Sequence, residues 1–495
     1  MSALDGLATA CLLPGFPGDQ LPDWVRAALD DGLPGVALYG ANAVSEESLP
    51  ALAAQVRAGW PHALVAVDEE GGDVTRLEYR RGSSYPGNQA LGAVDDEALT
   101  REVFRALAAD LRAAGITVDL APCVDVASDP RNPVIGARSF GADPGLVARH
   151  GAAAVRGLQD GGVAAVVKHF PGHGATADDS HVAAPVVDAD EATVRARDLP
   201  PFAAAVRAGA LAVMTGHVVF RALDPEPATH SRCLLVDLLR GELGFTGAVV
   251  TDALDMAAVR ARHGVAGAAV RALGAGADLL LLGAEDGATT YPDARAALVA
   301  AVRRRAVPEE RLVDAAERVA QLRRETAALP PPGPVDRAVG LRAARAAVRV
   351  RGAVPLSPAE LAGGVVVAEV RGEANLAVGE APWSLADTLR RLGVRVEAVA
   401  VTGAVPADVL RTAGALVVAV RDAHRTPWQR RAVEAVLRVR PDAVLVALGT
   451  PADTVLAEAV LAEAVAGPGA RWVLAHSAAA VSVRAAADAL VGRGG

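Results

Sequence analysis

The chain has 495 residues, of which 52% are hydrophobic and 22% are charged. This composition is typical of a globular protein with a sizeable core and excludes a largely disordered chain, and the length favours two or more domains. With 49 basic and 58 acidic residues the net charge is −9, and aromatic residues make up only 3%. We therefore expect no nucleic acid and no anionic membrane surface among the partners.

Membrane, secretion and redox signals are absent from the sequence pattern. No apolar run approaches the ~20 residues that a membrane span needs. The first residues contain no basic region of the kind that opens a secretory signal. The three cysteines, Cys11, Cys123 and Cys233, are far apart and odd in number, which fits neither a disulfide framework nor a cysteine metal site. We expect a cytoplasmic protein without a membrane span, and its oligomeric state stays open.

The first two-thirds of the chain alternates short aliphatic runs with longer helical stretches. The seven clearest runs are 36–39, 64–67, 116–120, 163–167, 212–215, 248–251 and 278–282. A weaker run at 9–13 is a plausible eighth. Strands that alternate with helices indicate βαβ units and a parallel sheet. Eight such units in about 300 residues predict an α/β fold that begins with a (β/α)8 TIM barrel.

A proline-rich segment divides the chain. Residues 328–335 read Ala-Leu-Pro-Pro-Pro-Gly-Pro-Val, which prevents a continuous helix. We predict a catalytic barrel over residues 1–327, a linker over 328–345 and a smaller doubly wound α/β domain over 346–495. The strands expected in that domain are 365–370, 394–401, 415–420, 443–448 and 472–475. Neither domain contains a glycine-rich phosphate loop, so nucleotide binding has no support.

Polar residues stand directly after four of the predicted barrel strands. Asp68, Lys168 with His169, His217, and Asp252 each follow a different run. In a TIM barrel these positions converge on the carboxyl-terminal end, where active sites are built. Taken singly, each acid has a structural alternative as a helix or turn cap. Four such positions on four strands favour an active site.

Lys168 is the only lysine in the chain, and the other 48 basic residues are arginine. Where nearly every cation has become arginine, a retained lysine suggests a site that needs a compact point charge. Chance retention on the surface is the alternative. The position of Lys168 inside the run Lys-His-Phe-Pro-Gly-His-Gly at 168–174 favours a functional role.

The loop after this run contains Asp179-Ser180-His181. In an extended or turn segment, side chains two residues apart can lie on one side, so Asp179 can orient the imidazole of His181 and stabilise its protonated form. An imidazole titrates near neutral pH and suits general acid/base catalysis. The alternative for the tripeptide alone is an Asx turn with a solvated histidine.

A carboxylate at the end of a barrel strand and an acid/base on a loop describe glycoside cleavage. A retaining glycosidase needs a nucleophile on one side of the bond and an acid/base on the other. We assign Asp252 as the nucleophile, His181 as the acid/base and Asp179 as its dyad partner. An imidazole needs no hydrophobic pocket to raise its pKa, unlike a carboxyl group in the same role.

With these residues the sequence resembles the family 3 glycoside hydrolases, in particular their β-N-acetylglucosaminidase branch in its two-domain form. The resemblance runs from about residue 10 to residue 325. The matching motifs are Val-Asp-Glu-Glu-Gly-Gly-Asp-Val-Thr-Arg-Leu at 67–77, Asn-Pro-Val-Ile-Gly-Ala-Arg-Ser-Phe-Gly at 132–141, Lys-His-Phe-Pro-Gly-His-Gly at 168–174, Asp-Ser-His at 179–181, Asp-Leu-Pro-Pro-Phe at 198–202, Leu-Gly-Phe-Thr-Gly at 243–247 and Thr-Asp-Ala-Leu-Asp-Met at 251–256.

The resemblance implies retaining hydrolysis of terminal β-linked N-acetylglucosamine without a metal or organic cofactor. A small carbohydrate is then the partner, and a muropeptide from wall recycling or a chito-oligosaccharide is the expected substrate type. By motif position Asp252 matches the nucleophile, His181 the acid/base and Asp179 its partner. The residues that match the sugar-binding positions are Asp68, Arg76, Arg138, Lys168 and His169.

The sequence departs from the family pattern in the first motif. The usual Asp-Gln-Glu-Gly-Gly-Arg-Val reads Asp-Glu-Glu-Gly-Gly-Asp-Val at 68–74. Glu69 and Asp73 are expected to add negative charge beside the site. Ala175 also replaces a polar residue that is common after the glycine-rich turn.

Three other functions fit parts of the pattern. A phosphorylase would use the same site with phosphate as the acceptor, because an imidazole acid/base carries no fixed negative charge to repel an anion. A metal-dependent barrel hydrolase would use Lys168, His169, His217 and Asp252, but the sequence lacks the His-x-His pair that such sites usually contain. A non-catalytic sugar-binding protein would not need Asp252, Asp179 and His181 intact.

Overall fold

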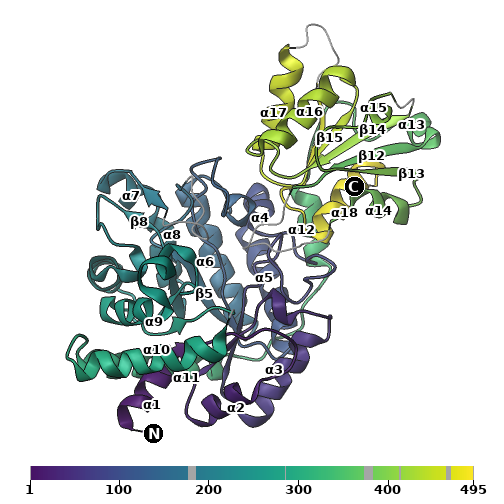
Figure 1. Ribbon diagram of the computed structural model, residues 1–495. Coiled ribbons are helices and arrows are strands. Elements are labelled where there is room, and N and C mark those ends of the chain that lie inside the picture. Colours follow the sequence, from purple (N-terminus) through teal and green to yellow (C-terminus); the bar gives the residue numbers. More distant parts are fainter. Residues whose placement is uncertain are drawn as a thin grey trace. The chain divides into compact units, whose positions relative to one another are not determined.

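The computed structural model describes residues 2–176, 185–284, 286–372, 383–411, 414–463 and 470–493. The chain divides into two compact units, shown in Figure 1. The first unit comprises residues 1–70, 96–135 and 139–336, and the second comprises 71–95, 136–138 and 337–495. Two short segments from the N-terminal half of the chain therefore fold with the C-terminal unit, which the predicted domain limits did not anticipate.

The first unit is a barrel of eight parallel strands. Six of them hydrogen-bond in the order β2-β3-β4-β5-β7-β9, and β1 pairs in parallel with β10. Val250 of β9 bridges Leu279 beside β10, and the amide of Ala37 in β2 donates to the carbonyl of Pro14 after β1 (3.0 Å). The strands are β1 (Leu12–Leu13), β2 (Gly35–Ala37), β3 (Leu64–Val67), β4 (Val118–Asp119), β5 (Ala164–Phe170), β7 (Ala212–Thr215), β9 (Ala248–Thr251) and β10 (Leu280–Leu281). The predicted TIM barrel is confirmed, and the weaker run at 9–13 supplies its strand β1.

The helices of this unit follow the strands along the chain (Figure 1). They are α1 (Ala3–Ala10), α2 (Asp23–Asp30), α3 (Ser48–Gly59), α5 (Glu97–Ala113), α6 (Pro144–Asp160), α7 (Glu191–Arg197), α8 (Leu199–Arg207), α9 (Ala257–Ala275), α10 (Gly287–Arg303) and α11 (Glu309–Ala328), with a π-helix at Cys233–Glu242. Two short strands, β6 (Val186–Val187) and β8 (Val219–Phe220), pair outside the barrel. Side chains from all eight barrel strands, such as Leu13, Ala66 and Met214, form one buried cluster that fills the interior.

The second unit is built on a six-stranded sheet in the order β11-β16-β15-β14-β12-β13. Its strands are β11 (Arg349–Arg351), β12 (Val365–Val370), β13 (Val396–Val401), β14 (Ala415–Val420), β15 (Val444–Ala447) and β16 (Arg471–Leu474). The last five are parallel and match the predicted aliphatic runs. The edge strand β11 is antiparallel to β16 and was not predicted, because three exposed residues, two of them arginine, give no aliphatic run.

Alternation along the strands separates two apolar layers in this unit. On one face Val367 and Val417 pack with helices α14 (Leu385–Arg391) and α18 (Ala480–Leu490). On the other face Val366 and Val418 pack with α16 (Pro427–Val439) and α17 (Ala452–Glu463). The remaining helices of the unit are α4 (Asn88–Val94), α12 (Val339–Ala347), α13 (Pro358–Gly363) and α15 (Ala407–Leu410), with a 3-10 turn at Gly136–Arg138. Helices on both faces confirm the doubly wound architecture.

The described helices include no candidate membrane span. None of them is both long and apolar enough to cross a bilayer.

Candidate active site

Contacts link the ends of four barrel strands in a continuous series. Lys168 at the end of β5 meets Asp68 after β3. The next residue, His169, lies against Gly216, which follows β7. The amide of Gly216 donates to the carbonyl of Phe170 (2.8 Å). His217 then contacts the carbonyl of Ala253 after β9. The structure therefore brings together the predicted residues of β3, β5 and β7 and carries the series to the residue after Asp252.

Lys168 lies at the centre of an acidic cluster. Its Nζ is 2.6 Å from Oδ1 of Asp68 and 2.8 Å from Oε1 of Glu70. The lysine side chain is only 2% exposed, and that of Asp68 is 19% exposed. A buried cation between two carboxylates is held by strong charge-assisted hydrogen bonds. A compact ammonium makes both contacts at an almost fully buried position, which fits the retention of one lysine among 48 arginines.

His169 is held by a hydrogen bond to Asp125, which is fully buried. The Nδ1 atom of His169 lies 2.7 Å from Oδ2 of Asp125, and the other oxygen accepts from the backbone amide of His173 at 2.7 Å. Burial acts to raise the pKa of Asp125, but His169 and the other donors outweigh it and lower this pKa to about 2. The ionised carboxylate can only accept, so Nδ1 of His169 carries a proton and Nε2 remains for other contacts.

Asp119, at the end of β4, is another acid near the lysine cluster. Its Oδ1 accepts from the backbone amide of Glu69 (3.0 Å), and Oδ2 is buried without a hydrogen-bond partner. Burial is the main cause that raises the pKa of Asp119 well above its ordinary value, and the charges of Glu69 and Asp68 act in the same direction. Burial thus disfavours the ionised form of Asp119 beside the cluster around Lys168.

The nucleophile candidate Asp252 follows β9 directly. Its backbone amide donates to the carbonyl of Thr215 (3.2 Å), and its Oδ1 accepts from the backbone amide of Ala253 (2.8 Å). His217 supports the same turn: Nε2 lies 3.0 Å from the carbonyl of Ala253 and Nδ1 lies 2.7 Å from the hydroxyl of Thr229. Both ring nitrogens are therefore engaged, and His217 serves to shape the turn that presents Asp252.

The loop after β5 is fixed up to its last described residue, Thr176. Nδ2 of Asn132 donates to the carbonyls of His173 (2.8 Å) and Thr176 (2.9 Å). Gly174 passes so close to the backbone that an added Cβ would lie 1.9 Å from the carbonyl oxygen of Val126. Only glycine fits there. The predicted acid/base residues Asp179 and His181 lie outside the described residues.

The two predicted sugar-binding arginines belong to the second unit. Arg76 is in the segment 71–95 and Arg138 in the segment 136–138, and both side chains are buried. The backbone carbonyl of Arg138 accepts from Nδ2 of Asn88 (2.7 Å). Asp73, expected as an added negative charge, forms an ion pair with Arg421 at 2.9 Å inside the same unit, so its charge is compensated.

Within the described ranges one group of side chains has metal-ligand spacing. The ligand atoms of Cys123, Asp125 and His169 lie within 4.8 Å of one another. Asp125 already accepts bonds from the thiol (3.1 Å), the ring and two backbone amides. A cation would have to displace these donors, so the group fits a hydrogen-bonded support for His169. The predicted alternative set that includes His217 and Asp252 does not form such a group in the part of the chain that is described.

Sequence reasoning missed three residues of this arrangement. Glu70 stands in the same run as Asp68, so its position two residues further on was the available signal. Asp119 ends β4 and Asp125 follows that strand, which is among the barrel strands to which no strand-end candidate was assigned. An acid at the end of a buried strand was the signal for Asp119.

Comparison with known proteins gives a consistent result. Residues 26–322 match the model described as the glycosyl hydrolase family 3 N terminal domain. A β-hexosaminidase of Stenotrophomonas maltophilia strain K279a is 40% identical over 283 residues, which cover 55% of this chain and 82% of that protein.

Solved structures extend the similarity over both units. The glycoside hydrolase family 3 β-N-acetylglucosaminidase of Paenibacillus sp. strain FPU-7 superposes with a TM-score of 0.88 at 31% identity, covering 100% of this chain and 97% of that chain. A β-glucoside phosphorylase has a TM-score of 0.79 over 100% of this chain and 92% of that one. Its identity is 18%, so this likeness concerns the fold alone.

Proposed function

Because the chain belongs to glycosyl hydrolase family 3, we propose that it is a retaining β-N-acetylglucosaminidase that removes terminal β-linked N-acetylglucosamine. The observation that carries the proposal is the series of contacts from Asp68 through Lys168 and His169 to the turn of Asp252. This series places acid, ammonium and imidazole groups at the carboxyl-terminal end of a barrel, where enzymes of this fold bind their substrates. The Stenotrophomonas and Paenibacillus relatives support the choice of sugar.

In the proposed reaction the carboxylate of Asp252 attacks the anomeric carbon while the bond to the aglycone breaks. The aglycone oxygen receives a proton from His181, whose protonated form Asp179 stabilises. The imidazole of His181 then takes a proton from water, which attacks the glycosyl ester of Asp252 and releases the sugar with retained configuration. Two displacements on opposite faces account for the retention. The roles of Asp179 and His181 rest on the sequence motif.

The proposed contacts to the sugar follow from exposure and hydrogen-bonding capacity. Asp68 is the most open member of the lysine cluster, so its carboxylate is suited to accept from sugar hydroxyls. Lys168 and Nε2 of His169 supply further contacts, and Arg76 and Arg138 complete the proposed set. A muropeptide or a chito-oligosaccharide is the substrate type that we propose. None of the three cysteines forms a disulfide, which favours a reducing compartment such as the cytoplasm.

The proposal is tested by incubating the protein with an aryl β-N-acetylglucosaminide in buffers with and without phosphate. We expect release of the aryl alcohol at equal rates in both buffers, together with free N-acetylglucosamine. Faster release with phosphate and a sugar 1-phosphate as product would replace the hydrolase with a phosphorylase. Release from the aryl β-glucoside alone would contradict the proposed sugar specificity.

A further inference from the structure

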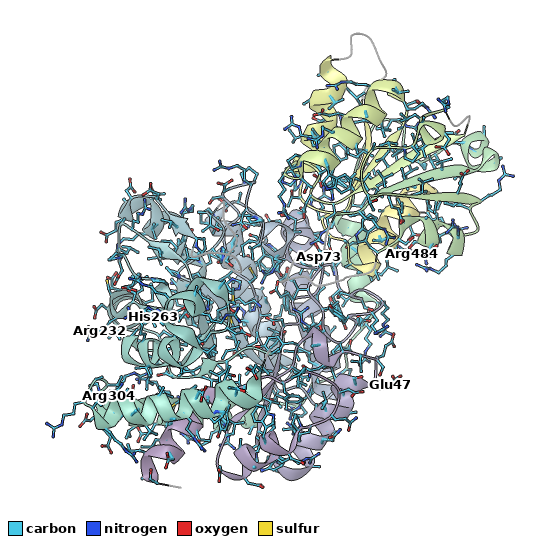
Figure 2. All side chains as sticks on the ribbon, in the orientation of Figure 1. Glu47, Asp73, Arg232, His263, Arg304 and Arg484 are labelled. Carbon is cyan, nitrogen blue, oxygen red and sulfur yellow. The ribbon has the colours of Figure 1, made fainter. Side chains whose placement is uncertain are left out.

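The segment after β3 is anchored in the second unit. Oδ1 of Asp73 accepts from the backbone amide of Ala478 (2.7 Å) and from the hydroxyl of Ser477 (3.2 Å), and Oδ2 lies 2.9 Å from Nη2 of Arg421. The side chain of Asp73 is only 3% exposed. Three bonds from two strand ends of the second unit therefore fix this one residue, which is labelled in Figure 2.

Further contacts hold the rest of the segment in the same unit. The amide of Val481 in α18 donates to the carbonyl of Ser83 (3.4 Å). Gly340 in α12 packs so close that an added Cβ would lie 1.9 Å from the carbonyl oxygen of Ser84. Nη2 of Arg349 donates to the carbonyl of Ala93 at the end of α4 (2.6 Å). The segment is thus part of the packing of the second unit.

The ion pair of Asp73 with Arg421 is electrostatically favourable. Arg421 directly follows β14 and also lies 3.9 Å from Asp422. Burial acts to lower the pKa of Arg421, but Asp73, Asp422 and Asp453 outweigh it, and the net pKa is above its ordinary value. A cation surrounded by acids stays charged. Removal of Asp73 would leave that cation short of its closest partner, which is costly where solvent is largely excluded.

The importance of the ion pair comes from the residues that this segment carries. Arg76 stands three residues after Asp73, and Asn88 in α4 binds the backbone of Arg138. Both proposed sugar-binding arginines are therefore placed by the second unit. The matching family motif usually has arginine where this chain has Asp73. The ion pair with Arg421 therefore involves a residue at which this chain departs from the family pattern.

We propose that the second unit positions the sugar-binding arginines, and that the Asp73–Arg421 ion pair is the anchor that holds the Arg76 segment for substrate. The inference rests on the proposed function for its catalytic consequence. Asp73 and Arg421 act here as positioning residues, through Arg76.

The test uses the full chain with single and paired substitutions. Asp73→Asn and Arg421→Gln each break the ion pair, and we expect a rise in KM of about tenfold or more with a smaller change in kcat, as for a displaced binding group. The exchange of both charges, Asp73→Arg with Arg421→Asp, should recover part of this loss. Asp73→Arg alone sets two guanidinium groups against each other and should be the most impaired.

Asp488→Asn is the matched control. Asp488 is a carboxylate of the same unit with a side chain only 1% exposed, and it binds Arg345 (2.7 Å) and Arg484 (2.9 Å), the latter labelled in Figure 2. Both of these partners lie outside the segments 71–95 and 136–138. We expect this variant to lower the melting temperature while KM stays at the wild-type value. A KM increase equal to that of Asp73→Asn, or a wild-type KM in folded Asp73→Asn, would overturn the proposal.

Hydrogen exchange keeps the inference separate from the proposed function. In Asp73→Asn the amides of residues 71–95 should exchange faster than in the wild type, and in Asp488→Asn they should not. Inactivity of the wild-type protein toward N-acetylglucosaminides would contradict the proposed function, and the exchange result would still decide whether the anchor exists. Unchanged exchange in Asp73→Asn would refute the anchor itself.

Discussion

The run of residues 68–73 supplies acids to a cation in each unit, and the two pairs differ in kind. In the barrel, Lys168 is held between Asp68 and Glu70. In the second unit, Arg421 is held by Asp73. The side chain of Asp68 keeps 19% of its surface exposed, whereas that of Asp73 keeps only 3%. In the first pair the acid is the exposed partner and Lys168 is only 2% exposed, whereas in the second pair the cation Arg421 is the exposed partner, at 21%.

This difference separates recognition from positioning. An ammonium point charge can rearrange its three donors when a sugar hydroxyl approaches, whereas the donors of a planar guanidinium keep a fixed arrangement relative to one another. The lysine cluster is therefore suited to bind substrate and the arginine pair is suited to hold a segment in place. Acids only a few residues apart acquire different roles from the cations that they meet.

Because the proposed chemistry lies at the carboxyl-terminal end of the barrel, the largest effect should come from Asp252. Asp252→Ala removes the proposed nucleophile and should lower kcat by at least about 10⁴-fold. Initial rates on the aryl N-acetylglucosaminide measure the change, and circular dichroism verifies folding. Asp96→Asn serves as the control, because Asp96 caps α5 and asparagine caps a helix equally well. An active, folded Asp252→Ala variant would contradict the assignment.

The two cations, Lys168 and Arg421, should differ in how well each tolerates replacement by the other type of basic residue. Lys168→Arg should lower kcat/KM by about 10²-fold or more, because a larger, planar guanidinium at this buried position must displace its neighbours or lose one of the two contacts. Arg421→Lys, which keeps the charge at a side chain that is 21% exposed, should cost less than about tenfold. The two kcat/KM values are compared at one pH. Equal losses would show that the two pairs do not differ in their demand for one particular cation.

Substitution of the two acids around Lys168 should affect activity and stability to different extents. Asp68→Asn should lower kcat/KM by about 10²-fold, because the more exposed carboxylate is the one proposed to bind the sugar. Glu70→Gln should mainly lower stability, with about a tenfold loss in kcat/KM, since Glu70 is buried and acts through Lys168. Steady-state kinetics give the loss in kcat/KM of each variant, and urea unfolding gives the loss in stability. A larger kinetic loss in Glu70→Gln would reverse the assigned roles.

The smallest expected effect concerns Asp125 and acid stability. Its folded-state pKa of about 2 lies below the ordinary 3.8, so the ionised carboxylate stabilises the fold above pH 3.8 by about 2 kcal/mol. This stabilisation is lost as the pH falls toward 2. The difference in unfolding free energy between wild type and Asp125→Asn should therefore shrink between pH 4 and pH 2. A constant difference over this range would contradict the shifted pKa.

Local sequence pattern was enough to predict the barrel, the doubly wound unit and the polar residues after four of the barrel strands. Aliphatic runs reveal buried strands, and parallel strands necessarily place the residues after their carboxyl ends at one end of the barrel. The support of His169 by Asp125 was not predictable in this way, because a buried acid has no periodic signature. The Asp73–Arg421 pair joins residues that are far apart in sequence, and the short strand β11 carries no aliphatic run. Contacts that depend on tertiary packing of single polar residues need the structure.

The most direct test of the central claim is the mass of the protein during turnover of a slow fluorinated N-acetylglucosaminide. The account predicts that the intact chain gains the mass of one sugar residue. After peptic digestion this added mass should lie on the peptide that contains Asp252, and the peptide should lose it when turnover completes. Turnover without any covalent adduct, or an adduct on a different carboxylate, would contradict the assignment of Asp252 as the nucleophile of a retaining enzyme.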